Sequence, residues 1–365
     1  MATTLVVVGK SLKLNKAFLD YIDAQVYLHV KTPEKKIFLD KSNKDLFLIM
    51  ENVMREPNQT IIAAATDSFN LIGKVISTIS EDVLELKDTM LIPSKVQEYT
   101  EKSYVFEYEG KKINVIEAKE NFILPDILID GDSESEIFSL IGVDEDSTKI
   151  LLNPLADTYE IKLTSTSIVE GWNAIEATTN KYGNLENFFK SVKSLFPDKF
   201  IRNSNVVAHI IESLETAGET VSVAESCTGG KIAAMITCVA GSSSVFNGSI
   251  ISYSNEIKKS WLGVSDVTLQ KYGAVSELCI REMLEGVLNA SSGDYAMATS
   301  GIAGPTGGSL EKPVGTVFVG ARSKDGDITV ERLLLQGDRE YIQEQSAYHA
   351  FRLLLAVGKN LFFKK

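Results

Sequence analysis

Two adjacent nucleophiles, Ser226 and Cys227, lie in the glycine-closed stretch AESCTGG that begins at Ala224. Apolar residues alternate before this stretch, which predicts a strand, and a run with helical spacing follows it. At the start of a helix, free backbone N–H groups and the helix dipole favour negative charge, either a phosphate or a developing oxyanion. The turn therefore suggests nucleophilic catalysis, although a serine at such a place more often caps the helix.

A base for the serine could come from the segment SYSNEIKK, which supplies Tyr253, Asn255 and Lys258 shortly after a second predicted strand. A lysine that is partly desolvated beside a serine can be neutral and accept its proton. The alternative is that Lys258 and Lys259 are solvated helix residues, as most lysines are. The chain has only three histidines, all isolated, which disfavours a Ser-His-Asp mechanism.

Two further segments could bind an anionic ligand. The loop TSGIAGPTGG contains Ser300, Gly301 and Gly304, and its N–H donors suit a phosphate or a planar ring. Arg339, in the segment QGDREYI, could donate two parallel hydrogen bonds to phosphate or carboxylate oxygens. The alternatives are a structural turn for the loop and a surface ion pair with a neighbouring acid for the arginine.

These segments need an α/β framework to bring them together. Three of the four follow predicted strands, and open α/β sheets bind ligands at the carboxyl ends of their strands. The pattern predicts a helix over 206–217, a second helix capped by Ser276, a hairpin turning at Asp325 and Gly326, and a last helix from about Asp338. We therefore expect a shared cleft at the strand ends.

Composition limits the class of protein. The 365 residues suffice for two or three domains, and a net charge of -12 without a basic cluster disfavours a nucleic-acid partner. No segment approaches the ~18 consecutive apolar residues of a membrane span, and the apolar N-terminal run lacks the charged start of a signal peptide. Three cysteines give no disulfide framework, and no His or Cys spacing suits zinc. We expect a soluble cytoplasmic protein.

Three domains are predicted, over 1–130, 131–200 and 201–365. The first and last alternate strands with helices, and the middle one is a small α+β segment. The acidic run DGDSESE, from Asp130, is typical of a linker. Most of the 25 glycines lie after residue 200, so turns that let the backbone approach a ligand are concentrated in the last domain.

Six ordered motifs between Asn205 and Phe363 closely resemble the CinA C-terminal domain family: VAESCTGG, SYSNEIK, YGAVSE, TSGIAGPTGG, KPVGTV and GDR. Members are nicotinamide mononucleotide (NMN) deamidases, which form nicotinic acid mononucleotide and ammonia without a metal or cofactor. The resemblance implies Ser226 as nucleophile, Lys258 as base and Tyr253 as a residue that orients the base. The residues expected to bind substrate are Cys227, Thr228, Gly229, Gly230, Asn255, Ser300, Gly301, Gly304 and Arg339.

The whole chain also resembles full-length CinA, with a molybdopterin-binding-like first domain and a KH-like middle segment. Family first domains carry GTELLLG and GGLGPT.DD types of motif, associated with metal-dependent ADP-ribose pyrophosphatase activity. This chain reads VGKSLKLN from Val8 and AAATDSFN from Ala63, with Ser11 at the acidic position. Without those glycines the backbone cannot easily approach a pyrophosphate, and without the carboxylates a divalent metal lacks its oxygen ligands. We expect the first domain to keep its fold and to have lost the pyrophosphatase activity. A divalent metal is then expected as a cofactor only if this domain is active after all.

The resemblance also implies a homodimer with NMN as its small-molecule partner, in pyridine-nucleotide recycling. No membrane partner is expected, and the acidity of the middle segment argues against RNA. One alternative is a bifunctional enzyme that also cleaves ADP-ribose. The other is a non-enzymatic, competence-linked adaptor, which the loss of Ser226 or Lys258 would have favoured; both are present.

Overall fold

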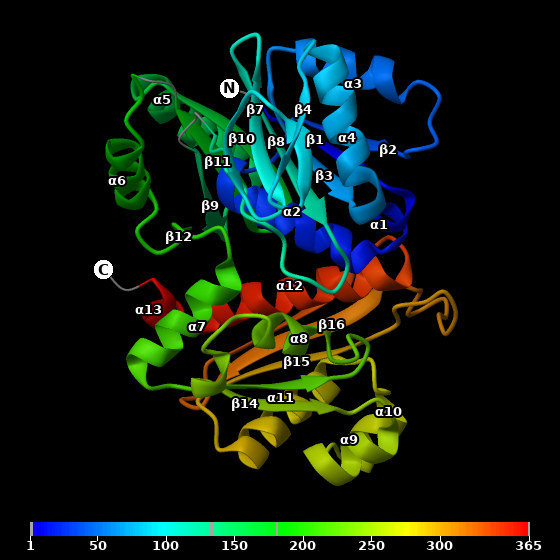
Figure 1. Ribbon diagram of the computed structural model, residues 1–365. Coiled ribbons are helices and arrows are strands. Elements are labelled where there is room, and N and C mark those ends of the chain that lie inside the picture. Colours follow the sequence, from blue (N-terminus) through cyan, green and yellow to red (C-terminus); the bar gives the residue numbers. More distant parts are fainter. Residues whose placement is uncertain (1–2, 132–134, 180–181, 364–365) are drawn as a thin grey trace. The chain divides into compact units, whose positions relative to one another are not determined.

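The computed structural model describes residues 3–131, 135–179 and 182–363. The chain divides into two compact units, Met1–Glu134 and Ser135–Lys365, and both combine helices with β-sheets (Figure 1). The predicted α/β fold class is therefore confirmed. The boundaries of three domains remain predictions, and the predicted linker from Asp130 falls partly outside the described residues.

The first unit is built on a six-stranded sheet in the order β2-β1-β3-β8-β7-β6. Strands β2, β1, β3 and β8 are parallel, whereas β7 and β6 are antiparallel to their neighbours. The strands are β1 (Thr3–Val8), β2 (Lys35–Leu39), β3 (Gln59–Ala65), β6 (Val96–Thr100), β7 (Ser103–Tyr108) and β8 (Lys111–Ala118), beside a ribbon of β4 (Leu84–Lys87) and β5 (Met90–Pro93). The helices are α1 (Lys10–Leu14), α2 (Lys16–Val30), α3 (Leu46–Arg55) and α4 (Thr66–Ile79).

Strand β1 shows why this sheet is covered by helices on both faces. Leu5 and Val7 pack in a core that contains Ile22 of α2, whereas Val6 and Val8 pack in a second core with α3 and α4. A strand buried on both faces appears in the sequence as a continuous apolar run. The two buried strands expected from such runs, TLVVVG and TIIAAAT, are confirmed as β1 and β3.

The second unit contains two sheets, of which the first is antiparallel with the order β10-β11-β9-β12. Helices α5 and α6 pack against this sheet in a core that contains Phe138 and Phe188. The elements are β9 (Ser135–Ile141), α5 (Glu145–Thr158), β10 (Ile161–Val169), β11 (Trp172–Thr179), α6 (Leu185–Leu195) and β12 (Phe200–Ile201).

The other sheet has the order β14-β13-β15-β16-β17, with β14, β13 and β15 parallel and the last two strands antiparallel. One core contains residues of α9 and α11, and another contains residues of α7, α8 and α12. The elements are α7 (Val206–Ala217), β13 (Val221–Glu225), α8 (Lys231–Thr237), η1 (Ser242–Ser244), β14 (Phe246–Ile251), α9 (Asn255–Leu262), α10 (Asp266–Lys271), α11 (Glu277–Ser291), β15 (Tyr295–Gly301), β16 (Thr316–Ser323), β17 (Ile328–Leu334), α12 (Arg339–Val357) and α13 (Lys359–Phe362).

Several predicted elements of this part are confirmed. The helix expected over 206–217 is α7. Ser276 caps α11 by accepting a hydrogen bond from the N–H of Cys279 at 3.3 Å. The hairpin expected at Asp325 joins β16 to β17, and α12 begins after an N-cap at Asp338. None of the helices that the structure describes is both long and apolar enough to cross a membrane.

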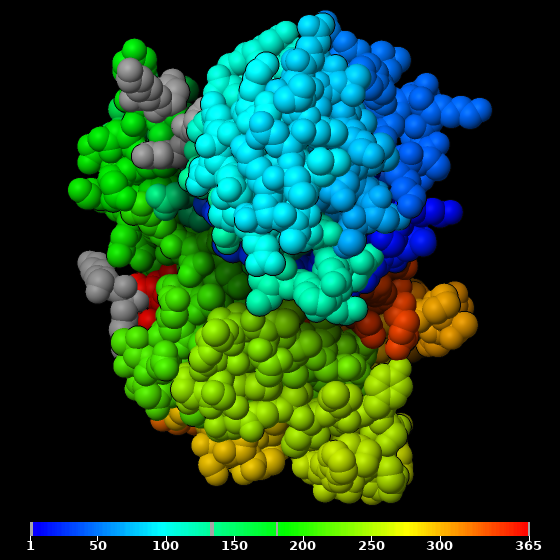
Figure 2. All heavy atoms as spheres, viewed as in Figure 1, coloured from blue at the N-terminus to red at the C-terminus, as the bar shows by residue number. Residues whose placement is uncertain are grey.

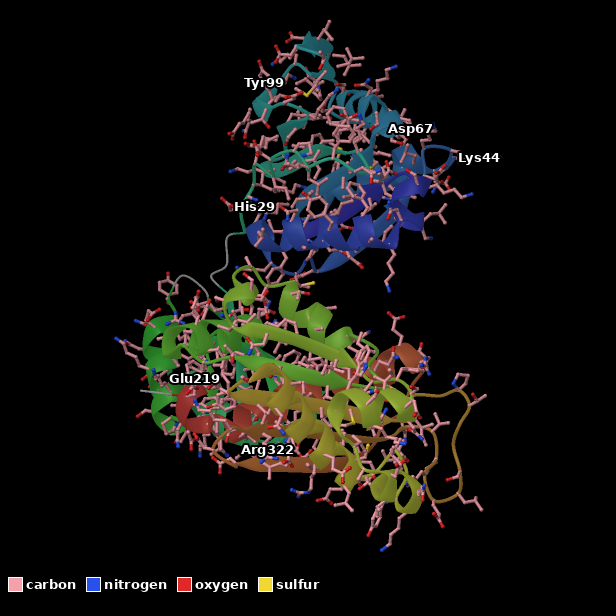
Figure 3. All side chains as sticks on the ribbon, turned by 90° about the horizontal axis from the view of Figure 1, so that it is seen from below. His29, Lys44, Asp67, Tyr99, Glu219 and Arg322 are labelled. Atoms are coloured by element: carbon pink, nitrogen blue, oxygen red, sulfur yellow. The ribbon has the colours of Figure 1, made fainter. Side chains whose placement is uncertain are left out.

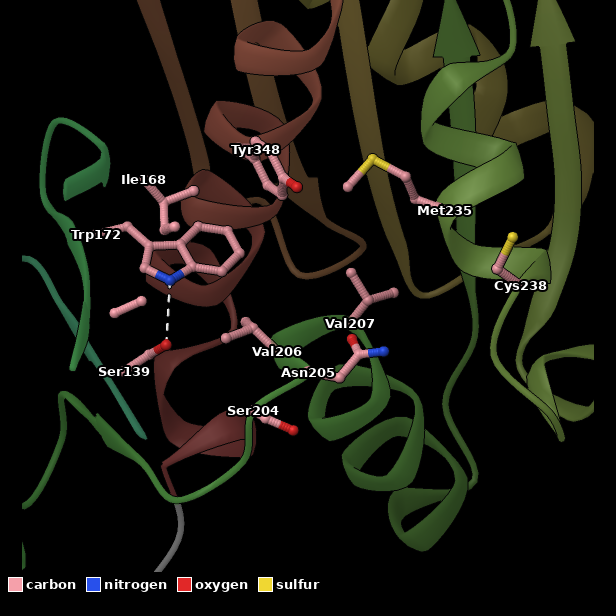
Figure 4. A pocket seen from close by; sticks show the side chains of 11 residues that line it. Ser139, Ile168, Trp172, Ser204, Asn205, Val206, Val207, Met235, Cys238 and Tyr348 are labelled. Carbon is pink, nitrogen blue, oxygen red and sulfur yellow. Dashed lines mark hydrogen bonds between the residues drawn. The ribbon is translucent and has the colours of Figure 1, made fainter. Parts of the chain in front are cut away.

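The two sheets of the second unit share an apolar core. Trp172 of β11 donates from Nε1 to Ser139 Oγ at 3.2 Å, and its ring meets Tyr348 of α12 edge-on with centroids 5.5 Å apart (Figure 4). A cavity of 420 Å³ lies beside these rings. Since the core also contains residues of β9, β10 and α7, the segment from Ser135 packs as one unit with the rest of the chain.

Candidate active site

The candidate site is a cavity at the carboxyl ends of three parallel strands. Strand β13 pairs in parallel with both β14 and β15, so the segments that leave these strands meet at one edge of the sheet. With the start of α12 they line a cavity of about 370 Å³. The predicted residues in its lining are Ser226, Cys227, Tyr253, Asn255, Lys258, Ser300, Gly301, Gly304 and Arg339. Three others, Thr228, Gly229 and Gly230, are not among the described residues that line it.

Lys258 and Ser226 form a close pair within this cavity. Lys258 Nζ donates to Ser226 Oγ at 2.9 Å and to the carbonyl oxygen of Ser252 at 2.5 Å. The lysine is only 1% exposed, so the alternative of a solvated helix lysine is wrong. Helix α9 is capped by Ser254, whose Oγ accepts from the N–H of Ile257 at 3.2 Å. This cap fixes the first turn of the helix, which carries Lys258 into the protein.

Burial lowers the pKa of Lys258 from its usual 10.5. The cause is desolvation, because taking the ammonium group out of water disfavours the charged form. In the part of the chain that the structure describes, no carboxylate pairs with Lys258 to oppose this effect. A larger share of neutral amine beside a serine hydroxyl gives Lys258 the capacity to accept the serine's proton.

The reactivity of Ser226 should therefore rise with pH. We expect its labelling by a fluorophosphonate probe to accelerate as the pH rises through the lowered pKa of Lys258, because only the neutral amine accepts a proton. The rate should level off with a midpoint below 10.5. The measurement is the second-order labelling rate across a pH series. A rate independent of pH, or one still rising at 10.5, would contradict a desolvated lysine base.

Cys227 is less suited to act as the nucleophile. Its side chain is buried, and burial raises the pKa of the thiol to about 12. The thiol is therefore protonated at neutral pH, and the thiolate is the reactive form of cysteine. No histidine is found among the described residues that line the cavity. These features support Ser226 over Cys227.

The start of α8 is held by Glu225 and not by Ser226. The N-cap position of α8 is Gly230, which has no side-chain cap. Glu225 Oε2 accepts from the N–H groups of Gly230 at 2.9 Å and Ile232 at 3.2 Å, and Oε1 accepts from that of Ala233 at 3.0 Å. The alternative that Ser226 serves as the helix cap is therefore wrong.

The turn leaves fewer N–H groups for an oxyanion than its sequence suggests. The N–H of Gly229 donates to the carbonyl oxygen of Ser226 at 3.2 Å, and that of Gly230 donates to the carboxylate just described. The N–H groups of Cys227 and Thr228 have no oxygen acceptor among the described residues. Of these two residues, Cys227 lines the cavity, whereas Thr228 is not among the described residues that do.

Arg339 joins two of the segments around the cavity. Its Nη1 donates to the carbonyl oxygen of Gly304 and its Nη2 to the hydroxyl of Tyr253, both at 2.8 Å. The alternative is a surface ion pair between Arg339 and a neighbouring acid. This alternative is wrong, because Arg339 pairs with no carboxylate among the described residues and the side chain of Asp338 caps α12. No bond joins Tyr253 to Lys258 within the described chain, so the proposed orienting role of Tyr253 remains a prediction.

The glycine loop between β15 and β16 projects from the second unit (Figures 1 and 2). Gly304 has a φ of +78°, and a Cβ there would lie 2.5 Å from Val314 Cγ1. A Cβ on Gly301 would lie 2.7 Å from Val317 Cγ2 and 2.8 Å from its Cα. Both glycines are therefore required by the path of the backbone, whatever their role toward a ligand.

Sequence reasoning missed several residues at the site. Ser300 Oγ donates to the carbonyl oxygen of Ala274 at 2.8 Å, and Ala274 and Val275 line the cavity. They lie in the motif YGAVSE, but their side chains carry no chemistry that would single them out. Gln343 of α12 donates from Nε2 to the carbonyl oxygen of Cys227 at 2.7 Å. This contact joins residues far apart in the sequence, so no local signal could reveal it.

The described lining of the cavity contains basic residues and no acidic ones, although the chain carries a net charge of -12. Lys258 and Arg339 are the basic residues in this lining, and Arg339 supplies a positive charge even when the desolvated Lys258 is neutral. The described partners of Arg339 are uncharged oxygens. A cavity of this size and charge suits a small anionic molecule.

The part of the chain that carries this cavity matches known proteins. A family model described as the CinA C-terminal domain matches residues 203–357. A nicotinamide-nucleotide amidohydrolase PncC from Enterobacter agglomerans is 49% identical over 143 residues, which are 39% of this chain and 87% of that protein. A CinA-like protein from Thermosipho melanesiensis is 44% identical over 177 residues, 48% of this chain, and the match spans only 44% of that relative's length.

A solved structure gives a further likeness. The competence/damage inducible protein CihA from Agrobacterium tumefaciens is 38% identical, with 42% of this chain and 93% of that chain covered and a TM-score of 0.42. Because 87% of the Enterobacter protein is matched at 49% identity, and because the family model covers the whole cavity-bearing part, the chain belongs to the CinA family.

Proposed function

We propose that the second unit hydrolyses the carboxamide of NMN to nicotinic acid mononucleotide and ammonia, with Ser226 as nucleophile and Lys258 as base. The observation that carries this proposal is the buried Lys258 Nζ, 2.9 Å from Ser226 Oγ in a cavity that has no acidic residue in its described lining. The relative named a nicotinamide-nucleotide amidohydrolase supports the substrate and the reaction.

In the first step, the neutral amine of Lys258 takes the proton of Ser226, and the serine oxygen attacks the carboxamide carbon. The carbonyl oxygen becomes an oxyanion, which the N–H groups of Cys227 and Thr228 would bind. Lys258 then returns its proton to the carboxamide nitrogen. The C–N bond breaks, ammonia leaves, and an acyl group remains on Ser226.

The second step regenerates the enzyme. A water molecule gives a proton to Lys258 and attacks the acyl carbon. The bond to Ser226 Oγ breaks, the serine recovers its proton from Lys258, and nicotinic acid mononucleotide leaves. Neither step uses a metal or a cofactor in this proposal.

The phosphate of NMN would bind Arg339, whose guanidinium has only uncharged partners among the described residues. The N–H donors of the loop that contains Gly301 and Gly304 would complete the phosphate site. Asn255 and Ser300, which also line the cavity, would contact the rest of the nucleotide.

Two carboxylates of the first unit already have partners among the described residues. Asp67 is paired with Lys41 at 2.5 Å, and Asp40 accepts from the N–H of Ser42 at 2.9 Å (Figure 3 labels Asp67). Among the described residues, no group of three or more His, Cys, Asp or Glu side chains could hold a metal ion. These observations support the proposal that this unit has lost the pyrophosphatase activity and has a scaffolding or dimerisation role in a cytoplasmic homodimer.

Ammonia release from NMN by the full chain tests this function. We expect release to continue with a metal chelator present, because no proposed step uses a metal, and we expect no cleavage of ADP-ribose in parallel samples. Hydrolysis of ADP-ribose with added metal would favour the bifunctional alternative. A protein that releases no ammonia from NMN would contradict the proposal and favour the adaptor or another amide substrate.

A further inference from the structure

Glu225, the last residue of β13, is completely buried. Besides the N–H groups of Gly230, Ile232 and Ala233, its carboxylate accepts a hydrogen bond from Ser249 Oγ of β14 at 3.1 Å. Each carboxylate oxygen thus accepts two bonds. Buried polar groups are normally satisfied in this way, and a group with four donors around it is held in one position.

The backbone of Glu225 leads to the other half of the reactive pair. Its carbonyl oxygen accepts from the N–H of Ser252 at 2.7 Å and from Ser252 Oγ at 3.3 Å. The carbonyl oxygen of Ser252 accepts from Lys258 Nζ at 2.5 Å. Glu225 is also bonded covalently to Ser226. Nucleophile and base are therefore both positioned relative to the same residue.

We propose that Glu225 is a positioning residue, which fixes the distance between Ser226 Oγ and Lys258 Nζ; this inference rests on the proposed serine–lysine reaction. Its side chain anchors the far end of the AESCTGG turn, and its carbonyl oxygen anchors the segment that orients the lysine. Neither anchor touches the cavity, because Glu225 is not among the described residues that line it.

Only a carboxylate of this length suits the position. Glutamine has the same shape but replaces one acceptor oxygen by an NH₂ group, which would face donors instead of accepting from them. Aspartate is one methylene shorter and would not reach α8 and β14 together. We therefore expect Glu225→Gln to loosen the turn, while the chemical identity of every group that contacts the substrate stays the same.

A matched control lies at the other end of the same strand. Asp294 accepts from the N–H of Thr220 at 2.7 Å, directly before β13, and pairs with Lys324. Asp294→Asn therefore makes the same chemical change in a carboxylate that holds the same strand, but at the end remote from Ser226. Thermal unfolding of both variants measures how much stability each change removes.

The experiment measures the labelling of Ser226 by a fluorophosphonate in the full chain, and KM and kcat for NMN. For Glu225→Gln we expect labelling and kcat to fall about 100-fold, because displacement of a reacting group by about 1 Å costs that much. The KM should change less than about twofold, because the residues that contact NMN are intact. Asp294→Asn should keep both rates within about twofold of the unchanged protein, whatever stability it loses.

If Glu225→Gln folds and is labelled at the rate of the unchanged protein, the inference is wrong. It is also wrong if Asp294→Asn slows labelling as much as Glu225→Gln does. If Glu225→Gln does not fold, Ser249→Ala tests the inference instead, because it removes one of the four donors to the Glu225 carboxylate. We expect Ser249→Ala to slow the labelling of Ser226 about fivefold. An unchanged labelling rate would refute the inference. If NMN is not a substrate, the labelling rates still decide the role of Glu225. A wild-type Ser226 that the probe does not label at all would refute it too.

Discussion

Lys258→Met is expected to slow NMN hydrolysis strongly and, at the same time, to make the folded protein more stable. Loss of a general base that also protonates the leaving group should lower kcat by about 10²- to 10⁴-fold. Methionine has a similar length and no charge, so the residue remains packed within its core. The observation behind both effects is a lysine that is 1% exposed and pairs with no carboxylate among the described residues.

The gain in stability should depend on pH in a defined direction. The pKa of Lys258 is lowered in the folded chain, so between that value and 10.5 the unfolded chain binds more protons than the folded one. The free energy of unfolding of the unchanged protein therefore rises with pH across this window. We expect the advantage of Lys258→Met to be largest below the lowered pKa and to shrink toward 10.5, as measured by urea unfolding in a pH series.

The adjacent lysine provides the control for this variant. Lys259 is charged and pairs with Asp266 at 2.7 Å on the surface of the second unit. Lys259→Met should leave kcat within about twofold and give no gain in stability. An active Lys258→Met protein would show that another group is the base. A stability difference between this variant and the unchanged protein that does not vary with pH would contradict the lowered pKa of the lysine.

Ser226→Ala is expected to remove NMN hydrolysis by at least about 10³-fold, because no acyl-enzyme can form without the hydroxyl. The substitution deletes one atom at a residue that is 8% exposed, so the fold should be unaffected. Ammonia release under saturating NMN measures the loss. Mass spectrometry after labelling should find the fluorophosphonate on Ser226 in the unchanged protein and on no residue of the variant.

Cys227→Ala is the matched control, one residue along the same turn. The thiol has a pKa raised to about 12, so it contributes no nucleophile at neutral pH, and we expect this variant to keep kcat within about threefold. Its N–H group, which we assign to the oxyanion, is unchanged. If Cys227→Ala is inactive while Ser226→Ala still turns over, the nucleophile is the thiol and the serine–lysine assignment is wrong.

The sequence predicts the framework of the site well. Alternation and apolar runs predict β13 and its neighbours, and parallel pairing then places the segments after them at one edge. The types of residue that follow each strand are enough to name Ser226 and Lys258 as candidates. Their separation of 2.9 Å is not predictable in this way, because it depends on how α9 packs against the rest of the unit.

Glu225 shows where local reasoning fails. An acidic residue at the end of a strand normally faces water, and nothing in AESCTGG indicates otherwise. The carboxylate instead accepts hydrogen bonds from the N–H groups of residues five, seven and eight positions later in the chain. The turn between them contains Gly229 and Gly230, both in left-handed conformations. The contact between Tyr253 and Arg339 was missed for a different reason: it spans 86 residues and depends on the tertiary fold.

Main-chain carbonyl groups accept hydrogen bonds from several functional groups of the second unit. The carbonyl oxygens of Ser252, Gly304, Cys227 and Ala274 accept from Lys258, Arg339, Gln343 and Ser300, respectively. A main-chain acceptor survives any substitution that preserves the path of the backbone. Related sequences can therefore diverge at the residues that supply these carbonyl groups, except where a glycine is sterically required, while the geometry of the site is inherited with the fold.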